Sequence, residues 1–288
     1  MRLSNEWKDY ECISAGNGEK LERWGDITLR RPEPQAMWPV EEDTKWQKVD
    51  GHYFRYKDGG GHWEFNKELP ESWQIKYKDL IFKVRPTDFK HTGLFPEQAT
   101  NWDFMMNKIR DAKRPVKVLN LFGYTGAATV ACSKAGAECV VHVDAAKGIV
   151  AWAKENAQLS GVADNYIRFI VDDCLKFVER EIRRGNKYDA IIMDPPSYGR
   201  GPNGEVWKFE QNLDYLISKC MEILSDKPLF FLINAYTTGI SSTVLYNILQ
   251  LTVAKKYGGV VDHGEIGLPI TEKNLVLPCG IYGRWQDE

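Results

Sequence analysis

Hydrophobic residues gather in short runs from about residue 116 onward, and these runs predict the buried strands of a sheet. Segments with helical spacing separate the runs, as at Ile149, Trp152, Ala153 and Ala157. Strands that alternate with helices predict an α/β fold with a Rossmann-like, doubly wound and mostly parallel sheet. The predicted strands are Val116–Phe122, Cys139–Asp144, Tyr166–Val171, Tyr188–Met193 and Leu229–Asn234.

Two further apolar runs lie near the C-terminus, at Val260–Ile266 and Leu275–Ile281, and no helical segment separates them. A parallel pair of strands needs a long crossover connection, whereas an antiparallel pair needs only a short loop. We therefore expect the sheet to close with an antiparallel terminal hairpin.

Residues 1–90 have a different pattern, in which short alternating runs are separated by glycine and proline turns. This region holds six of the ten tryptophans. Alternation between turn formers is typical of strands, so we expect a small, aromatic-rich antiparallel β domain at 1–90 and a second domain at 91–288. The predicted N-terminal strands are centred on Ile27–Arg30, His52–Tyr56, His62–Phe65 and Leu80–Val84.

Composition and charge narrow the class of protein. The 288 residues include 38 basic and 40 acidic side chains, for a net charge of −2, which is ordinary for a globular protein and unlike a dedicated basic nucleic-acid binder. Neither a long apolar span nor a secretory leader is recognisable, so we expect a cytoplasmic protein without membrane contact. The six cysteines are scattered without C-x-x-C spacing, so we expect free thiols and no metal site.

A glycine turn follows the first strand of the predicted sheet. Gly123 and Gly126 are spaced G-x-x-G, and the G-x-G-x-x-G triple of dinucleotide-binding proteins is absent. Glycines at this edge let a ligand approach the backbone. Because the triple that faces a pyrophosphate is absent, the turn favours a nucleoside cofactor without phosphates. The alternative is a plain strand-to-helix turn.

Carboxylates follow the next two strands. Asp144 lies 18 residues after Gly126, where an acidic side chain accepts hydrogen bonds from ribose hydroxyls or caps the helix that starts near Ala145. Asp172 and Asp173 precede Cys174, where a carboxylate and a backbone N–H can face adenine. Taken alone, these residues favour a cap for the helix at 175–182.

The fourth strand ends in Asp194, Pro195 and Pro196, followed by Ser197 and Tyr198. Two prolines fix the backbone and remove donors, which predicts a rigid loop with unpaired carbonyl groups. Such a loop can accept hydrogen bonds from a planar substrate that carries an amine, and Tyr198 can stack on its ring. The alternative is a rigid turn with a solvent-facing Asp194.

These segments together resemble class I S-adenosylmethionine-dependent methyltransferases, and within them the bacterial branch that includes large-subunit ribosomal RNA methyltransferases acting on cytosine or guanine. The resemblance covers about residues 80–285. Within this range, Lys90–Gln98 is similar to the family's stretch that leads into the catalytic domain and touches the cofactor. The segments that carry it are Asn120–Gly126, His142–Asp144, Asp172–Cys174 and Asp194–Gly201.

The resemblance implies S-adenosylmethionine as cofactor and RNA, ribosomal RNA first, as partner. It implies that Asn120–Gly126 cradle the methionine part, that Asp144 holds the ribose, that Asp173 and the Cys174 backbone hold adenine, and that Asp194–Tyr198 face a flipped-out base. The implied cofactor-binding residues are Phe95, Gln98, Asn120, Phe122, Gly123, Tyr124, Thr125, Gly126, Asp144, Ala145, Asp173 and Cys174. The implied catalytic residues are Asp194, Pro195, Pro196, Ser197 and Tyr198.

The chain departs from this family in its cysteines and its acceptor motif. Methylation of a cytosine carbon needs a cysteine thiolate that adds to the ring, yet no cysteine ends the fourth or fifth strand, and Cys220 and Cys279 lie elsewhere. We therefore predict a reaction without a covalent cysteine. Ser197 stands where many amine-methylating enzymes carry an aromatic residue, which leaves the acceptor atom open.

The N-terminal region lacks a basic character, with 16 Lys plus Arg against 17 Asp plus Glu in residues 1–90. Aromatic and basic residues alternate at 46–57, a pattern of single-strand binding surfaces, but a role in the core of the small sheet is favoured. A basic patch nearer the predicted cleft would contact phosphates, with a solvated charged face as the alternative. Its members would be Arg183, Arg184, Lys187, Arg200 and Lys208.

Four functions are compatible with these patterns. The first is a methyltransferase acting on a base in RNA, and the second is a methyltransferase acting on a small molecule or a protein. The third is an NAD-dependent oxidoreductase, which the missing glycine triple disfavours. The fourth is a non-catalytic binding module that retains the cofactor loop.

Overall fold

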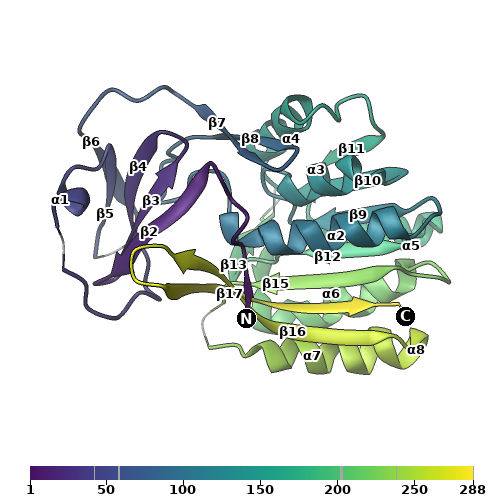
Figure 1. Cartoon of the computed structure of the whole chain (residues 1–288). Coiled ribbons are helices and arrows are strands. Elements are labelled where there is room, and N and C mark those ends of the chain that lie inside the picture. The colour runs from purple at the N-terminus through teal and green to yellow at the C-terminus, as the bar shows by residue number, and fades with distance from the viewer. Residues whose placement is uncertain (42, 58, 202–203, 238, 288) are drawn as a thin grey trace. The chain divides into compact units, whose positions relative to one another are not determined.

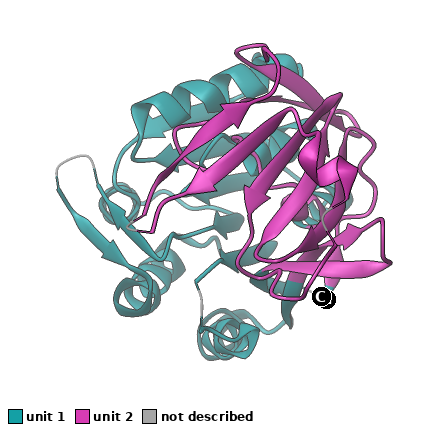
Figure 2. Ribbon diagram, turned by 90° about the vertical axis from the view of Figure 1, so that its left-hand side faces the viewer, with its two compact units in different colours: residues 1, 101–265, 280–288 teal, residues 2–100, 266–279 magenta. Residues whose placement is uncertain are grey.

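The computed structural model describes residues 1–41, 43–57, 59–201, 204–237 and 239–287. These residues form two compact units (Figure 2): unit 1 comprises residue 1 with 101–265 and 280–288, and unit 2 comprises 2–100 and 266–279. The first transition therefore lies between residues 100 and 101, and part of the terminal hairpin belongs to unit 2. The division into two domains at residue 90 stays a prediction.

Unit 1 contains a doubly wound sheet (Figure 1), as the apolar runs predict. Its strands lie in the order β11-β10-β9-β12-β15-β17-β16, and all neighbours from β11 to β15 are parallel. Strand β17 is antiparallel to β15 and is hydrogen-bonded to β16, so the sheet ends in the expected hairpin of β16 and β17. The bounds are β9 (Lys117–Leu121), β10 (Cys139–Asp144), β11 (Ile167–Val171), β12 (Ala190–Met193), β15 (Phe230–Ala235), β16 (Val260–Ile270) and β17 (Leu275–Gln286).

Helices cover both faces of this sheet, which is why its strands are apolar along their whole length. One face packs on helices α5, α6 and α7 through side chains such as Leu119, Val141 and Ile233. The opposite face packs on α2, α3 and α4, and Phe104 of α2 contacts the ring of Phe230 there. The bounds are α2 (Ala99–Asp111), α3 (Ala127–Lys134), α4 (Lys147–Leu159), α5 (Cys174–Arg184), α6 (Phe209–Ile223) and α7 (Ser242–Leu249).

Three shorter features complete unit 1. A hairpin of β13 (Tyr198–Arg200) and β14 (Val206–Lys208) lies between β12 and α6. A π-helical turn, η2 (Gln250–Ala254), and α8 (Lys255–Tyr257) follow α7. Among the described residues, no helix combines the length and the apolar character needed to cross a bilayer.

Unit 2 is built mainly of antiparallel strands, as expected. Strands β2, β3 and β4 form an antiparallel meander, and β5–β6 and β7–β8 are hairpins. The pair β4–β5 is parallel, because the intervening segment with α1 is long enough for a crossover. The bounds are β1 (Arg2–Leu3), β2 (Tyr10–Gly16), β3 (Glu19–Trp24), β4 (Ile27–Pro32), α1 (Thr44–Gln47), β5 (Gly51–Arg55), β6 (Gly61–Phe65), β7 (Trp73–Tyr77), β8 (Leu80–Val84) and the 3₁₀ turn η1 (Pro96–Gln98).

The aromatic run at 46–57 divides between the inside and the outside of unit 2. Trp46 and Tyr53 are buried, as the core interpretation predicts. Phe54 and Tyr56 are 37% and 50% exposed, so the core interpretation is wrong for these two rings. The reason is the period of two along a strand, which turns Tyr53 inward and its neighbour Phe54 outward.

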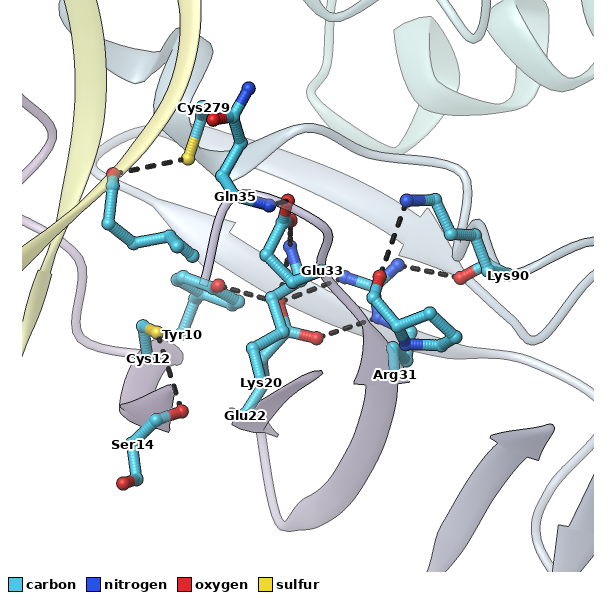
Figure 3. A network of polar contacts seen from close by, with 12 residues as sticks. Tyr10, Cys12, Ser14, Lys20, Glu22, Arg31, Glu33, Gln35, Lys90 and Cys279 are labelled. Atoms are coloured by element: carbon cyan, nitrogen blue, oxygen red, sulfur yellow. Dashed lines mark hydrogen bonds and ion pairs between the residues drawn. The ribbon is translucent and has the colours of Figure 1, made fainter. Parts of the chain in front are cut away.

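A buried ionic cluster joins the first strands of unit 2 (Figure 3). The carboxylate of Glu22 is fully buried and accepts hydrogen bonds from Arg31 Nε at 2.7 Å, Arg31 Nη2 at 2.9 Å and the Tyr10 hydroxyl at 2.7 Å. The Lys20 ammonium lies 3.5 Å from it. Burial opposes ionisation, but Arg31 and Lys20 lower the pKa of Glu22 to about 2. The cluster is therefore ionised at neutral pH and its carboxylate is satisfied.

Replacing Glu22 by Gln is expected to destabilise unit 2 by about 3–5 kcal/mol, because it leaves the Arg31 guanidinium buried without its carboxylate. Urea unfolding followed by tryptophan fluorescence measures the change. The control Glu64→Gln removes the exposed partner of His62 and should change the free energy of unfolding by about 0.5 kcal/mol or less. Because the folded pKa of Glu22 is low, its contribution is present above pH of about 4 and is lost as the pH falls toward 2. Equal effects of the two substitutions would contradict the role of the cluster.

Candidate active site

The polar segments singled out in unit 1 come together at the carboxyl edge of the sheet. Strand β9 lies between β10 and β12, and the chain reverses its winding there, so the loops after β9 and β12 separate at this point. Ligands bind at such a switch point in doubly wound sheets. The loop after β9, the ends of β10 and β11, and the loop after β12 supply the predicted site residues of this unit.

Hydrogen bonds hold the glycine loop after β9 in one conformation. The N–H of Gly123 donates to the Val143 carbonyl at 3.0 Å, and the N–H of Phe122 donates to Cys174 Sγ at 3.2 Å. Phe122 and Tyr124 have φ values of 55° and 49°, a left-handed conformation that is rare for aromatic residues. Strain of this kind persists only where surrounding contacts enforce it, and it often marks a functional site.

The space at both loop glycines is filled by the protein itself. A Cβ atom at Gly123 would lie 2.4 Å from His142 Cε1, and one at Gly126 would lie 2.8 Å from the Ala153 Cβ. Gly126 also has a φ of 83°, which favours glycine. Internal packing therefore explains both glycines, and the approach of a ligand to them stays a prediction.

A buried polar chain supports the loop from below. Asn120 Nδ2 donates to Thr129 Oγ1 at 2.9 Å, and the same hydroxyl lies 2.9 Å from His142 Nδ1. Because the hydroxyl accepts from Asn120, we infer that it donates to Nδ1. Burial lowers the pKa of His142 to about 3, so the ring stays neutral. The side-chain amide of Asn120 thus donates to Thr129 within the protein. Sequence reasoning did not assign His142 this role, because nothing local indicates its contact with Gly123.

Asp144 ends β10 and lies beside the loop. Its Oδ2 accepts from the Tyr124 N–H and its Oδ1 from the Ala146 N–H, both at 3.0 Å. Helix α4 begins at Lys147 with Ala146 as its N-cap, so Asp144 is not the capping residue. Burial raises the pKa of Asp144, although backbone N–H groups oppose the shift. A carboxylate has about four acceptor positions, so capacity for a ribose hydroxyl remains.

The two carboxylates after β11 have structural partners. Asp173 is the N-cap of α5 and accepts from the Lys176 N–H at 2.9 Å, which confirms the capping role. Asp172 accepts from Arg180. The buried Cys174 thiol accepts from the Phe122 N–H and lies 3.9 Å from the Val143 carbonyl oxygen, and burial raises its pKa. Contacts of Asp173 and the Cys174 backbone with adenine stay predictions.

Two carbonyl groups of the loop after β12 accept hydrogen bonds from the protein itself. Trp207 Nε1 donates to the Pro196 carbonyl at 2.7 Å, and the Phe209 N–H donates to the Ser197 carbonyl at 3.0 Å. The expectation of unpaired carbonyls is therefore wrong for these two, because the β13–β14 hairpin folds back onto the loop. Ser197 Oγ also lies 2.8 Å from Thr237 Oγ1, which links the loop to the residues after β15.

Trp207 connects the two loops of the site, and sequence reasoning missed it. The centroids of its indole ring and of the Phe122 ring in the glycine loop are 5.0 Å apart, and its Nε1 donates a hydrogen bond to the Pro196 carbonyl. The residue is 8% exposed, so it packs as part of the core. The glycines at 199, 201 and 204 are a turn signal that would have predicted the hairpin but not the contact of Trp207 with Phe122.

The remaining predicted residues lie outside this group or await a test. Phe95 and Gln98 belong to unit 2, at and within η1, and their cofactor contacts stay predictions. Cys220 is buried in α6, and burial raises the pKa of both Cys220 and Cys279. Over the described ranges, no three His, Cys, Asp or Glu side chains gather as a metal site would require.

This geometry fits a nucleoside cofactor. The hydrogen bonds of Asp144 leave acceptor capacity at the tip of β10, where the ribose of a bound nucleoside lies in this class of fold. The Tyr124 N–H donates to that carboxylate, and at the end of β11 the Asp172 N–H donates to the backbone carbonyl of Asp144. The doubly wound fold and the loops at its carboxyl edge are therefore those of an enzyme that binds a nucleoside cofactor.

Comparison with known proteins identifies the family. A family model described as S-adenosylmethionine-dependent methyltransferase matches residues 36–239, and the chain belongs to this family. The crystal structure of the SAM-dependent methyltransferase from Agrobacterium tumefaciens is 40% identical, has a TM-score of 0.94, and is matched over 100% of this chain and 93% of that one. The cofactor is S-adenosylmethionine, so the NAD-dependent alternative no longer applies.

More distant proteins share parts of the chain or the fold alone. A ribosomal RNA large subunit methyltransferase K/L from Syntrophotalea carbinolica is 32% identical over 151 residues, which are 52% of this chain and 20% of that protein. The chain thus spans about a fifth of the length of the curated relatives it matches. A putative methyltransferase from Streptococcus mutans, at 18% identity and a TM-score of 0.74 over 98% of this chain and 76% of that one, shows the shared fold.

Replacing Gly123 by Ala is expected to weaken S-adenosylmethionine binding about tenfold or more, because the new methyl group meets the His142 ring and must shift the loop. Isothermal titration calorimetry measures the affinity. Gly148→Ala is the matched control, since a Cβ atom there meets open space on α4, and it should leave the affinity unchanged. Wild-type affinity in Gly123→Ala would show that the loop does not need this contact.

The affinity for S-adenosylmethionine is expected to fall on acidification at a higher pH than an ordinary aspartate would produce. The pKa of Asp144 is raised, so the carboxylate becomes protonated and loses acceptor strength as the pH falls through that value. Calorimetry at decreasing pH, limited to conditions where circular dichroism shows the native fold, measures the profile. Asp144→Asn should bind more weakly and without this pH dependence. An unchanged profile in Asp144→Asn would remove Asp144 from the site.

Proposed function

We propose that this chain methylates a base in RNA, with ribosomal RNA as the first candidate, and that it does so in the cytoplasm. The acceptor loop at Asp194–Ser197 carries the proposal: it is rigid, it is joined to the glycine loop through Trp207, and it leads directly into Tyr198, which is 53% exposed. The names of the curated relatives support RNA as the substrate class. Because the chain matches only a fifth of their length, their RNA position is not carried over.

One group of residues would hold the cofactor, and a second group would position the acceptor. Bound S-adenosylmethionine supplies a methyl group on a sulfonium. Asp144 would accept from its ribose hydroxyls, the loop from Asn120 to Gly126 with Ala145 would surround it, and Asp173 with Cys174 would face adenine. Phe95 and Gln98 would contribute from the stretch before the catalytic region. None of these groups needs to transfer a proton, so alignment of the reactants supplies much of the rate.

The acceptor base would be held by the loop after β12. Among the described residues, the Pro195 carbonyl accepts no hydrogen bond, in contrast to those of Pro196 and Ser197. It can therefore accept from an amine or ring N–H of the base, with the Asp194 carboxylate beside it. Tyr198 would stack on the base once it has left its helix, and stacking tolerates any base.

We infer that the reaction uses no covalent cysteine. The acceptor loop, Asp194–Ser197, carries a hydroxyl and no thiol, and Ser197 Oγ lies 2.8 Å from Thr237 Oγ1. The Cys220 thiol is fully buried in α6, where its raised pKa disfavours the thiolate that would have to attack a ring. Methylation of a nitrogen fits this arrangement better than methylation of a ring carbon.

A transfer assay tests the proposal. With tritium-methyl-labelled S-adenosylmethionine, we expect label in RNA when total RNA, ribosomal subunits and a protein extract from a strain lacking the enzyme are offered. Asp194→Ala should lower transfer by about 10²-fold or more while calorimetry shows retained cofactor binding. The double variant Cys220→Ser/Cys279→Ser should still transfer methyl groups if it binds the cofactor. Label in protein or small molecules alone would overturn the RNA assignment and favour the second candidate.

A further inference from the structure

The β13–β14 hairpin has two chemically different faces. The register pairs Tyr198 with Lys208, Gly199 with Trp207 and Arg200 with Val206. Side chains alternate along a strand, so Trp207 faces the acceptor loop while the other four side chains share the opposite face. Tyr198 and Val206 are 53% and 52% exposed, and Arg200 and Lys208 are exposed as well. We call Tyr198, Arg200, Val206 and Lys208 the outer face.

Arg200 and Lys208 are the two cations of the outer face. In the part of the chain that the structure describes, the side chains of Arg200 and Lys208 form no ion pair or hydrogen bond. Neighbouring cations are paired, since Lys176 contacts Glu205 and Arg180 contacts Asp172. The carboxylate of Glu205, within the hairpin itself, is thereby neutralised. The outer face thus combines an aromatic ring with two available positive charges and no carboxylate.

This combination fits one kind of partner, a single strand of nucleic acid. Single-strand sites pair an aromatic platform for bases with positive groups that follow the backbone. An acidic peptide would satisfy the cations but not the exposed ring. An RNA duplex would not occupy the exposed ring, because its bases are stacked on one another.

The position of the hairpin adds a second argument. Tyr198 directly follows the acceptor loop, and Trp207 fixes the hairpin to the Pro196 carbonyl and to the Phe122 ring. A nucleotide that lies on the outer face is therefore next to one that enters the acceptor loop. A base that is extracted for methylation loses its stacking partners, and an exposed ring can replace one of them.

We propose that the outer face of the β13–β14 hairpin binds the single-stranded RNA around the target base, with the target base stacked on Tyr198 and the flanking backbone phosphates on Arg200 and Lys208. This inference rests on the proposed RNA function and adds the surface that grips the strand. It also assigns two members of the basic patch considered from the sequence. Arg183, on the last turn of α5, is not part of this face.

Fluorescence anisotropy with a labelled 12-nucleotide single-stranded RNA of mixed sequence tests the inference. We expect Tyr198→Ala to weaken binding roughly 5- to 100-fold and Tyr198→Phe to retain it, because the ring is what stacks. Arg200→Gln and Lys208→Gln should each weaken binding and lower the slope of log affinity against log salt by about 0.7. Arg183→Gln, which removes an exposed cation elsewhere on unit 1, should leave the affinity unchanged.

Two results would overturn the surface while leaving the RNA function intact. One is RNA methylation by the wild type together with unaltered affinity and KM for RNA in the Tyr198, Arg200 and Lys208 variants. The other is an equal loss in Arg183→Gln, which would indicate general charge rather than this face. Equal binding of the same RNA as a duplex would contradict the single-strand assignment. If the wild type neither binds nor methylates RNA, this inference and the proposed function fail together. For each variant, binding of S-adenosylmethionine measured by calorimetry serves as the control that the protein is folded.

Discussion

The site depends on the hydrogen bonds between the loop after β9 and the end of β10. The Gly123 N–H donates to the Val143 carbonyl and the Tyr124 N–H to the Asp144 carboxylate, so one strand end holds the loop of its neighbour. Parallel strands end at the same edge of a sheet, which makes such bonds possible between adjacent strands. Phe122 and Tyr124 adopt left-handed conformations within this frame, and the ring of His142 closes it from below. The conformation of the loop after β9 is therefore set by contacts within the fold.

One tryptophan joins the loop after β12 to the loop after β9. Trp207 contacts Phe122 with its ring and the Pro196 carbonyl with its Nε1. A shift of either loop would disturb this contact, so the two loops keep their spacing, which a transfer reaction needs because misalignment is costly. The same residue turns the other face of the β13–β14 hairpin outward. Internal packing thus explains why Tyr198, Arg200 and Lys208 are presented to solvent.

Two buried titratable groups, one in each unit, have different surroundings. In unit 1, burial without a countercharge keeps His142 neutral, and its hydrogen bond with Thr129 positions the ring under the loop. In unit 2, the two cations beside Glu22 keep that carboxylate ionised despite complete burial. Because the ring stays neutral, His142 gives the loop no pH dependence near neutrality, whereas burial raises the pKa of the neighbouring Asp144. The ionic cluster has a structural role, because breaking it would leave a charge unpaired.

The sequence by itself determined the strands, the fold class and the family. Apolar runs such as 116–122 mark strands that are buried on both faces, and Asp144 lies at the end of β10, the strand end to which its spacing from Gly126 assigned it. Tertiary structure alone decided which partner each residue meets. It placed His142 against Gly123, Trp207 against Phe122 and Pro196, and β4 parallel to β5. The physical reason is that a hydrophobic pattern records whether a residue is buried, whereas a contact between distant residues depends on how whole elements pack.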